Sequence, residues 1–241
     1  METYFDISFE FSKDAAHNII SEVVAQNRKG YICATDGVIL SNVNKNAGYR
    51  KVINDSLFST CDSRWITKYI RWLYGIQHKQ YCGSQIFNDV IQSKRYNMMF
   101  LGVNESVLNS LKDNLLKVDE RISDMPFIEL PFCDVLNFDY VAIAKTINTY
   151  KPDIIWIALG APKQEYFMAN LIPYLDSGVM IAVGAVFNFF SGKVKRAPKW
   201  MIDMNIEFLY RIKAEPRKQL ARCFFILSRL PMILYKEYRK K

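Results

Sequence analysis

Polar residues and glycines follow several short apolar runs of this 241-residue chain. Apolar runs without alternation fit strands that are covered on both faces, as in a parallel sheet. In open parallel sheets, ligands bind beyond the carboxyl ends of the strands. The candidate site residues are therefore those that follow or close the runs: Asp36, Asp62, Gly102, Gly160, Ala161, Pro162, Lys163 and Gln164.

Asp62 follows the run SLFSTC, which places its carboxylate among the candidate ligand-site residues. Aspartate is also a preferred N-cap, so an alternative role is to cap a helix that begins near Arg64. The two roles are compatible, and the sequence leaves both open.

Segment 160–164 (GAPKQ) is the candidate for holding a phosphate. Backbone N–H groups at a helix N-terminus bind phosphate, Lys163 would add positive charge, and Pro162 suits a first helical turn. The patterns GxGxxG and GxxxxGK[ST] are absent, which argues against a dehydrogenase or an NTPase. An Asp-x-Asp pair is absent as well, so a departing nucleotide would need Arg, Lys and helix ends to stabilise its charge.

The elements that must position these residues repeat as strand, loop and helix. Apolar runs at 31–34, 98–102, 154–160 and 179–186 predict strands, and segments 46–57, 107–116 and 164–175 predict helices. This order predicts an α/β fold with a mostly parallel sheet flanked by helices. We predict a catalytic core at 1–194 and a basic, amphipathic helical appendage at 195–241.

The appendage carries the positive charge of the molecule. The whole chain has a net charge of +8, whereas residues 195–241 hold 13 Lys/Arg and 4 Asp/Glu, a net of +9. Pro216 and Pro231 divide the appendage into two or three expected helices. Bulky apolar side chains among basic residues are typical of a helix that lies on an anionic membrane. The alternative is a terminal helix that packs on the core with a solvated basic face.

Composition limits the remaining possibilities. No run of 18 apolar residues and no leader-like N-terminus occur, so we expect neither a spanning helix nor a signal peptide. The five cysteines and two histidines form no metal-binding pattern, so we expect reduced, mostly buried cysteines in a cytoplasmic protein. No cofactor and no metal are expected.

Two segments carry a resemblance to a known family. PDIIWIALGAPKQEYFMANL and the later GAVFNFFSGKVKRAPKWMIDMNIEFLYRIKAEPRK resemble the WecG/TagA/CpsF glycosyltransferases (glycosyltransferase family 26), and MMFLGVNESVLNSLKDNL resembles an upstream segment of that family. The resemblance covers about residues 25–225. It implies a Rossmann-like catalytic core. It also implies a metal-independent, inverting transfer from a UDP-sugar, often N-acetylmannosamine or its uronic acid, to a polyprenyl-diphosphate-linked sugar in teichoic acid, common antigen or capsule assembly. It also implies an appendage that docks on the inner face of the cytoplasmic membrane and helps to close the active site.

The resemblance also assigns residues. The catalytic aspartate of the family falls on Asp62, and its donor-binding glutamine falls on Gln164. Where the family has a threonine and an asparagine, this chain has Ala34 and Asp36. Gln80 stands where the family has a basic residue. Asn188 replaces a frequent aspartate. The appendage arginines of the family fall on Arg211, then Arg217 or Lys218, then Arg222, and we expect them to contact acceptor diphosphate or membrane. Lys195 and Arg196 belong to a basic cluster for which we expect the same partners. These departures in the N-terminal half leave the donor sugar open.

Other functions remain open at this point. A Rossmann-type methyltransferase or oxidoreductase would share the fold, and a basic tail could bind nucleic acid in a non-enzymatic module. An inactive scaffold with the same fold is a third alternative. The sequence does not fix the oligomeric state, and a homo-oligomer is compatible with it.

Overall fold

A computed structural model of the chain describes residues 1–195, 197–198, 200–201, 204 and 206–241. Its centre is an eight-stranded sheet in the order β1-β2-β4-β3-β8-β7-β5-β6, in which only the β1–β2 pair is antiparallel. The strands are β1 (Glu2–Tyr4), β2 (Ile7–Phe9), β3 (Lys29–Thr35), β4 (Phe58–Cys61), β5 (Met98–Gly102), β6 (Phe127–Glu129), β7 (Ile154–Ala158) and β8 (Gly178–Ala182). The predicted mostly parallel α/β fold is confirmed.

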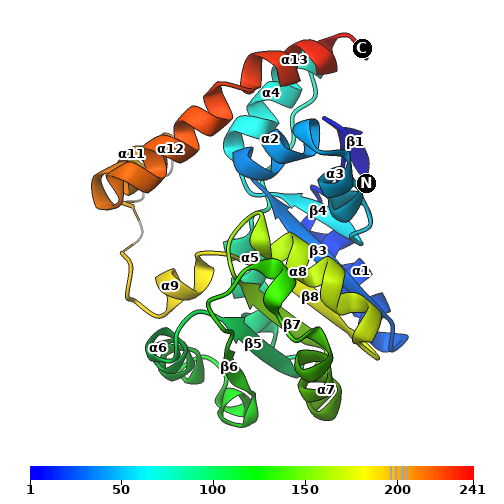
Figure 1. Cartoon of the computed structure of the whole chain (residues 1–241), viewed down its shortest axis with the longest axis vertical. Helices are drawn as coiled ribbons and strands as arrows, with labels where there is room; N and C mark the ends of the chain where they lie inside the picture. Colours follow the sequence, from blue (N-terminus) through cyan, green and yellow to red (C-terminus); the bar gives the residue numbers. More distant parts are fainter. Residues whose placement is uncertain (196, 199, 202–203, 205) are drawn as a thin grey trace.

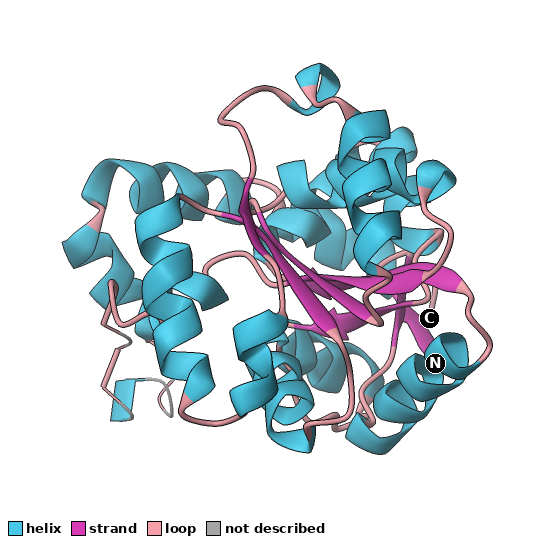
Figure 2. Ribbon diagram, turned by 90° about the horizontal axis from the view of Figure 1, so that it is seen from below, coloured by secondary structure: helices cyan, strands magenta, loops and turns pink. Residues whose placement is uncertain are grey.

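Helices cover both faces of this sheet (Figure 2). One apolar core joins the sheet to α2 (Gly37–Lys45), α3 (Ala47–Asn54), α4 (Arg64–Tyr74), α7 (Tyr140–Tyr150) and α8 (Lys163–Leu171). The other joins it to α1 (Lys13–Ala25), α5 (Gly83–Ser93), α6 (Glu105–Leu116) and α9 (Val186–Phe190). Short 3-10 turns lie at η1 (Glu120–Asp124), η2 (Val135–Asn137) and η3 (Ile172–Tyr174).

Strand β7 shows why its apolar run does not alternate. Ile155 and Ile157 enter one core, whereas Ile154 and Trp156 enter the other, and all four are fully buried. Each such side chain contributes roughly 1.5–3 kcal/mol by leaving water. The sheet is therefore a rigid base from which the loops at its carboxyl edge extend.

Several predicted boundaries were wrong. The helix expected at 46–57 is α3, which ends at Asn54, and a further helix that was not predicted, α2, precedes it because Asp36 starts α2 directly after β3. The run at 179–186 ends as a strand at Ala182, and Val186 already begins α9. The N-terminal strands β1 and β2 were not predicted, since each has only three residues.

The appendage follows the sheet as α11 (Glu207–Ala214), α12 (Pro216–Leu227) and α13 (Leu230–Tyr238). Pro216 begins α12 and Pro231 lies in the first turn of α13, as the sequence predicts. Figure 1 shows these helices as an arm along α2 and α4. Ile233 belongs to the first core, so the last helix packs on the fold. The boundary at 194/195 stays a prediction.

Two further expectations concern membrane-spanning helices and the state of the cysteines. Within the described ranges, none of the helices has the length and apolarity needed to cross a membrane. The five cysteines are free, and Cys33, Cys61 and Cys82 are buried, which confirms the expectation that most are buried thiols.

Candidate active site

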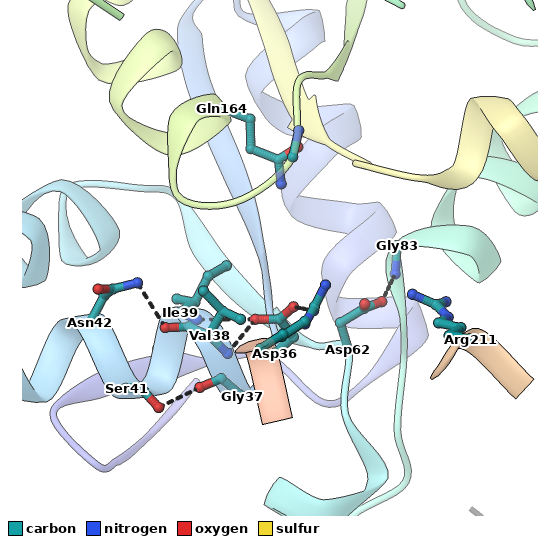
Figure 3. A network of polar contacts seen from close by, with 12 residues as sticks. Asp36, Gly37, Val38, Ile39, Ser41, Asn42, Asp62, Gly83, Gln164 and Arg211 are labelled. Carbon is teal, nitrogen blue, oxygen red and sulfur yellow. Dashed lines mark hydrogen bonds and ion pairs between the residues drawn. The ribbon is translucent and has the colours of Figure 1, made fainter. Parts of the chain in front are cut away.

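The sheet gathers the predicted site residues along its carboxyl edge. Asp62 follows β4, Asp36 follows β3, Gly160 lies just beyond β7 and Gly102 ends β5. These strands are parallel, and β8 completes the series between β3 and β7. Figure 3 shows Asp36 and Asp62 side by side, with Gln164 pointing toward them from α8. The sequence prediction that these loops share one edge is confirmed.

Asp62 is held by a different helix from the one expected. Its Oδ1 accepts a hydrogen bond from the backbone N–H of Gly83 at 2.9 Å, at the start of α5. Helix α4 has Ser63 as its N-cap, without a side-chain cap bond. The alternative in which Asp62 caps the helix near Arg64 was therefore wrong. The carboxylate instead sits at the positive end of α5, where a helix dipole favours negative charge.

Asp62 combines access with a poorly solvating environment. The residue is exposed on the edge of the sheet, so another molecule can reach it. Protein atoms nevertheless crowd its carboxylate, and this desolvation raises the pKa of Asp62 to about 7. The Gly83 hydrogen bond and the positive charges of Arg211 and Arg222 lower this pKa, whereas the charge of Asp36 raises it. A carboxyl group with a pKa near neutrality is suited to proton transfer.

Asp36 links the sheet to the appendage. Its Oδ1 accepts hydrogen bonds from the N–H groups of Val38 at 2.8 Å and Ile39 at 3.0 Å, which caps α2. Its Oδ2 forms an ion pair with Arg222 of α12. A second carboxylate at this edge would repel a diphosphate if it were unpaired. The ion pair with Arg222 offsets the negative charge of Asp36.

Gln164 lies in a chain of buried hydrogen bonds. Its Oε1 accepts from the N–H of Gly160 at 3.1 Å, and its Nε2 donates to Oε1 of Glu165 at 2.8 Å. Oε2 of Glu165 accepts from the hydroxyl of Tyr49 at 3.0 Å. Gln164 and Glu165 are 4% and 0% exposed, so this chain fixes the orientation of the glutamine amide.

Glu165 is a buried carboxyl group without a described ion-pair partner. Its pKa is raised to about 7, chiefly by burial and also by the negative charge of Asp36, although the hydrogen bonds from Gln164 and Tyr49 act in the opposite direction. Sequence reasoning missed this residue. The signal was available, since Glu165 occupies the apolar spacing of a helix whose buried side includes Met168 and Leu171.

In the turn before α8, groups that we expected to bind a phosphate already contact other parts of the protein. The Gly160 N–H, predicted to face a phosphate, already donates to Gln164. The Lys163 ammonium lies over the rings of Phe132 and Phe138, 5.6 and 5.0 Å from their centroids.

Gly102 has a φ of +143°, and a side chain there would meet the carbonyl of Ala158 at 2.7 Å. Glycine at 102 is therefore required by the packing of β5 against β7.

Comparison with known proteins shows the family of the chain. Residues 3–241 match the model of the Glycosyl transferase WecG/TagA/CpsF family. The chain belongs to this glycosyltransferase family. A relative from Bacillus subtilis (strain 168), named N-acetylglucosaminyldiphosphoundecaprenol N-acetyl-beta-D-mannosaminyltransferase, is 28% identical over 84% of each chain. Relatives of the same name from Bacillus spizizenii and Staphylococcus aureus (strain NCTC 8325) are 25% and 23% identical, over 80% and 88% of this chain and 74% and 80% of theirs.

In this glycosyltransferase, two appendage arginines reach the edge of the sheet. Arg222 pairs with Asp36, and Arg211 lies beside Gly83 and Asp62 (Figure 3). The guanidinium of Arg211 also stacks over Phe189 of α9 at 5.4 Å and pairs with Glu207 at 2.8 Å. Arg211 and Arg222 therefore lie at the carboxyl edge of the sheet, and their contact with acceptor diphosphate or membrane stays a prediction.

The other predicted cations lie elsewhere. Lys218 pairs with Glu215 at 3.1 Å, and Arg217 and Lys195 are exposed. Arg196 lies outside the described residues. Sequence reasoning also missed Gly83, because no local pattern indicates that its N–H meets a carboxylate 21 residues earlier. Across the described part of the glycosyltransferase, no group of three or more His, Cys, Asp or Glu side chains is arranged to hold a metal ion.

Proposed function

We propose that this glycosyltransferase moves an N-acetylmannosamine-type sugar, or another hexose, from a UDP-sugar to a polyprenyl-diphosphate-linked acceptor, with inversion at the anomeric carbon. One observation carries the proposal: Asp62 is an accessible carboxyl group with a pKa of about 7 beside two appendage arginines. The names of the relatives support an acceptor that carries N-acetylglucosamine on diphosphoundecaprenol.

Asp62 acts as the general base in this proposal. The acceptor hydroxyl loses its proton to the free carboxylate oxygen while the hydroxyl oxygen attacks the anomeric carbon from the face opposite UDP. One displacement forms the new glycosidic bond and breaks the bond to UDP, so the configuration inverts without a covalent enzyme intermediate. The Gly83 N–H holds Oδ1 at 2.9 Å, which supports a fixed direction for Oδ2.

Arg211 and Arg222 neutralise the charge that develops on the departing diphosphate. Guanidinium groups suit this role because they donate in a fork that matches phosphate oxygens. With arginines in this position, the proposed transfer uses no metal. The chain from Tyr49 through Glu165 to Gln164 supports a donor contact for the Gln164 amide. Asp36 and the loops at Gly102 and 160–164 line the same donor region.

The appendage is proposed to bring the enzyme to its lipid-linked acceptor at the inner face of the cytoplasmic membrane. Phe224 and Leu227 of α12 and Met232 of α13 are 76%, 62% and 64% exposed. Apolar side chains beside Arg217, Arg229 and the basic C-terminus suit an anionic bilayer. Flotation with anionic liposomes should succeed where a shift assay with DNA or RNA gives no complex.

Mass spectrometry of reaction products tests the proposed function. The protein is incubated with a panel of UDP-sugars and a short polyprenyl-diphosphate N-acetylglucosamine, and the product is isolated for its anomeric configuration. We expect a disaccharide lipid with inverted configuration from a UDP-linked N-acetylated hexosamine. Absence of transfer from every UDP-sugar, or a product of retained configuration, would contradict the proposal.

A further inference from the structure

Helix α4 exposes an aromatic ridge that the proposed site does not use. Trp65 and Trp72 are 43% and 71% exposed, whereas Ile66, Ile70 and Leu73 of the same helix are buried in the core. Positions 65, 68 and 72 share one helical face at spacings of three and four residues. Lys68 lies on this ridge, and its ammonium sits over the Trp65 ring at 4.4 Å. Exposed aromatic side chains grouped on one helical face are typical of an interaction site.

The charge of α4 has one sign. Residues 64–74 contain Arg64, Lys68 and Arg71 and no acidic residue, although residues 1–194 as a whole have a net charge of −1. Tryptophan beside lysine or arginine is typical of membrane interfaces, where the indole ring lies at the headgroup level and the cation meets lipid phosphate. A partner for this ridge should therefore combine apolar depth with negative charge.

The ridge is continuous with the appendage. Helix α4 starts two residues after Asp62 and ends at Tyr74, whose hydroxyl donates to Glu237 of α13 at 2.9 Å. Glu237 is 3% exposed and also accepts from the N–H of Phe5 at 2.8 Å, so this junction is fixed. The arm starts near Asp62 with Arg211 and Arg222 and ends at the same junction. Figure 1 shows α13 lying along α4.

We propose that the Trp65–Lys68–Trp72 face of α4 inserts into an anionic bilayer beside the appendage, as a second membrane contact carried by the catalytic core. The inference rests on the membrane docking of the appendage proposed above. It gives α4 a role in catalysis, because a helix seated in the headgroup layer holds Asp62, two residues before its start, near the surface where a lipid-linked acceptor resides. A core without this contact would be tethered only through the arm.

Tryptophan fluorescence with brominated phospholipids tests the contact. The chain has four tryptophans; Trp156 is fully buried in the core, and Trp200 can be removed as W200F. In W65F/W200F, only Trp72 and Trp156 emit. We expect vesicles of brominated phosphatidylglycerol and phosphatidylcholine to quench this variant more than unbrominated vesicles do. The matched control W65F/W72F/W200F retains only Trp156 and should show no quenching.

Vesicle sedimentation measures what the ridge adds to affinity. We expect W65A/W72A to weaken binding to anionic vesicles about tenfold or more, since two indole rings would leave the interface. Tyr150→Ala, which removes a 57% exposed aromatic side chain of α7, is the matched control and should bind like the wild type. Melting curves of each variant show that it is folded.

Three results would overturn the inference, and they separate it from the proposed function. If the protein sediments with vesicles but Trp72 emission is unquenched, the arm docks alone. If Trp72 is shielded only as the protein dimerises in sedimentation velocity, the ridge binds a second copy. If the wild type does not bind anionic vesicles, both membrane contacts fail. Transfer to a soluble short-chain acceptor still measures the proposed glycosyl transfer in each case.

Discussion

The N–H of Gly83 donates a 2.9 Å hydrogen bond to the carboxylate of Asp62 and thereby joins the start of α5 to the end of β4. A side chain at position 83 would approach Ala34 to 3.4 Å and Asp62 to 3.7 Å, which is ordinary contact. The bond orients Oδ1 of the carboxylate and leaves Oδ2 for contacts within the site. Arg211 and Arg222 on one side and Asp36 on the other then set its charge environment.

The pH dependence of transfer should report Asp62. Because a base must be deprotonated, and because desolvation of its carboxylate by surrounding protein atoms is the largest cause that raises the pKa of Asp62 to about 7, activity is lost as pH falls through that value. We expect kcat/KM to fall about tenfold per pH unit below pH 7 and to level off above about pH 8. Initial rates between pH 5 and 9 check this. An acidic limb centred near pH 4 would contradict it.

Neighbouring charges should move that midpoint in opposite directions. Asp36→Asn keeps the cap of α2 but removes a negative charge that raises the pKa of Asp62, so the midpoint should shift down by about half a unit. Arg211→Ala removes a positive charge and should shift it up by about as much. The readout is the midpoint of the normalised pH profile, which is separate from any loss of rate. Shifts of the same sign would exclude Asp62 as the titrating group.

Glu165 should make the protein less stable as pH rises. Its pKa in the folded chain is about 7 against an ordinary value of 4.5, so the unfolded chain releases the proton first. The stability present below pH 4.5 is lost as pH rises to about 7, and the difference is about 3 kcal/mol. Glu165→Gln should therefore raise the free energy of unfolding at pH 8 and change it little at pH 5.

Urea unfolding at the two pH values measures this. A glutamine at 165 can still accept from Gln164 and donate to the oxygen of Tyr49, so the buried contacts persist. Glu22→Gln, at an exposed position of α1, is the matched control and should behave alike at both pH values. If Glu165→Gln were destabilised equally at pH 5 and pH 8, the predicted loss of stability from Glu165 with rising pH would be wrong.

Gln164→Ala should weaken donor binding more than acceptor binding. The substitution leaves the Gly160 N–H without its acceptor and removes the amide that faces the two aspartates. We expect the KM for the UDP-sugar to rise about tenfold, with a loss of about 1–3 kcal/mol in stability from the unpaired groups. Steady-state kinetics with each substrate varied in turn distinguish an effect on the donor KM from an effect on the acceptor KM. A rise confined to the acceptor KM would assign Gln164 to the other substrate.

The apolar runs of the sequence predict the central strands because both faces of this sheet are covered. Ile154 to Ala158 show no alternation, and each residue enters one core or the other. Since parallel strands end at one edge, the grouping of Asp36 and Asp62 with segment 160–164 also follows from the sequence. Helix α2 was missed because its start is marked only by the side chain of Asp36, directly after the strand.

The contacts that complete the site depend on tertiary structure. Asp36 and Arg222 are 186 residues apart, and Tyr49 meets Glu165 over 116 residues. No periodicity or spacing encodes such pairs, because the sheet and the arm bring them together only in the folded chain. The ends of the apolar runs supplied Asp62 and Gln164 as candidates, and the family resemblance supplied their roles, whereas Gly83, Glu165 and Tyr49 emerged only from the structure.

Turnover of Asp62→Asn tests the central claim most directly. Asparagine can still accept the Gly83 hydrogen bond through its Oδ1, so the loop geometry is retained while the base is removed. With a UDP-linked N-acetylated hexosamine and a soluble polyprenyl-diphosphate N-acetylglucosamine, we predict that kcat falls about 100-fold or more while the donor Kd stays within twofold of the wild type. Full turnover by this variant would contradict the assignment of Asp62 as the base.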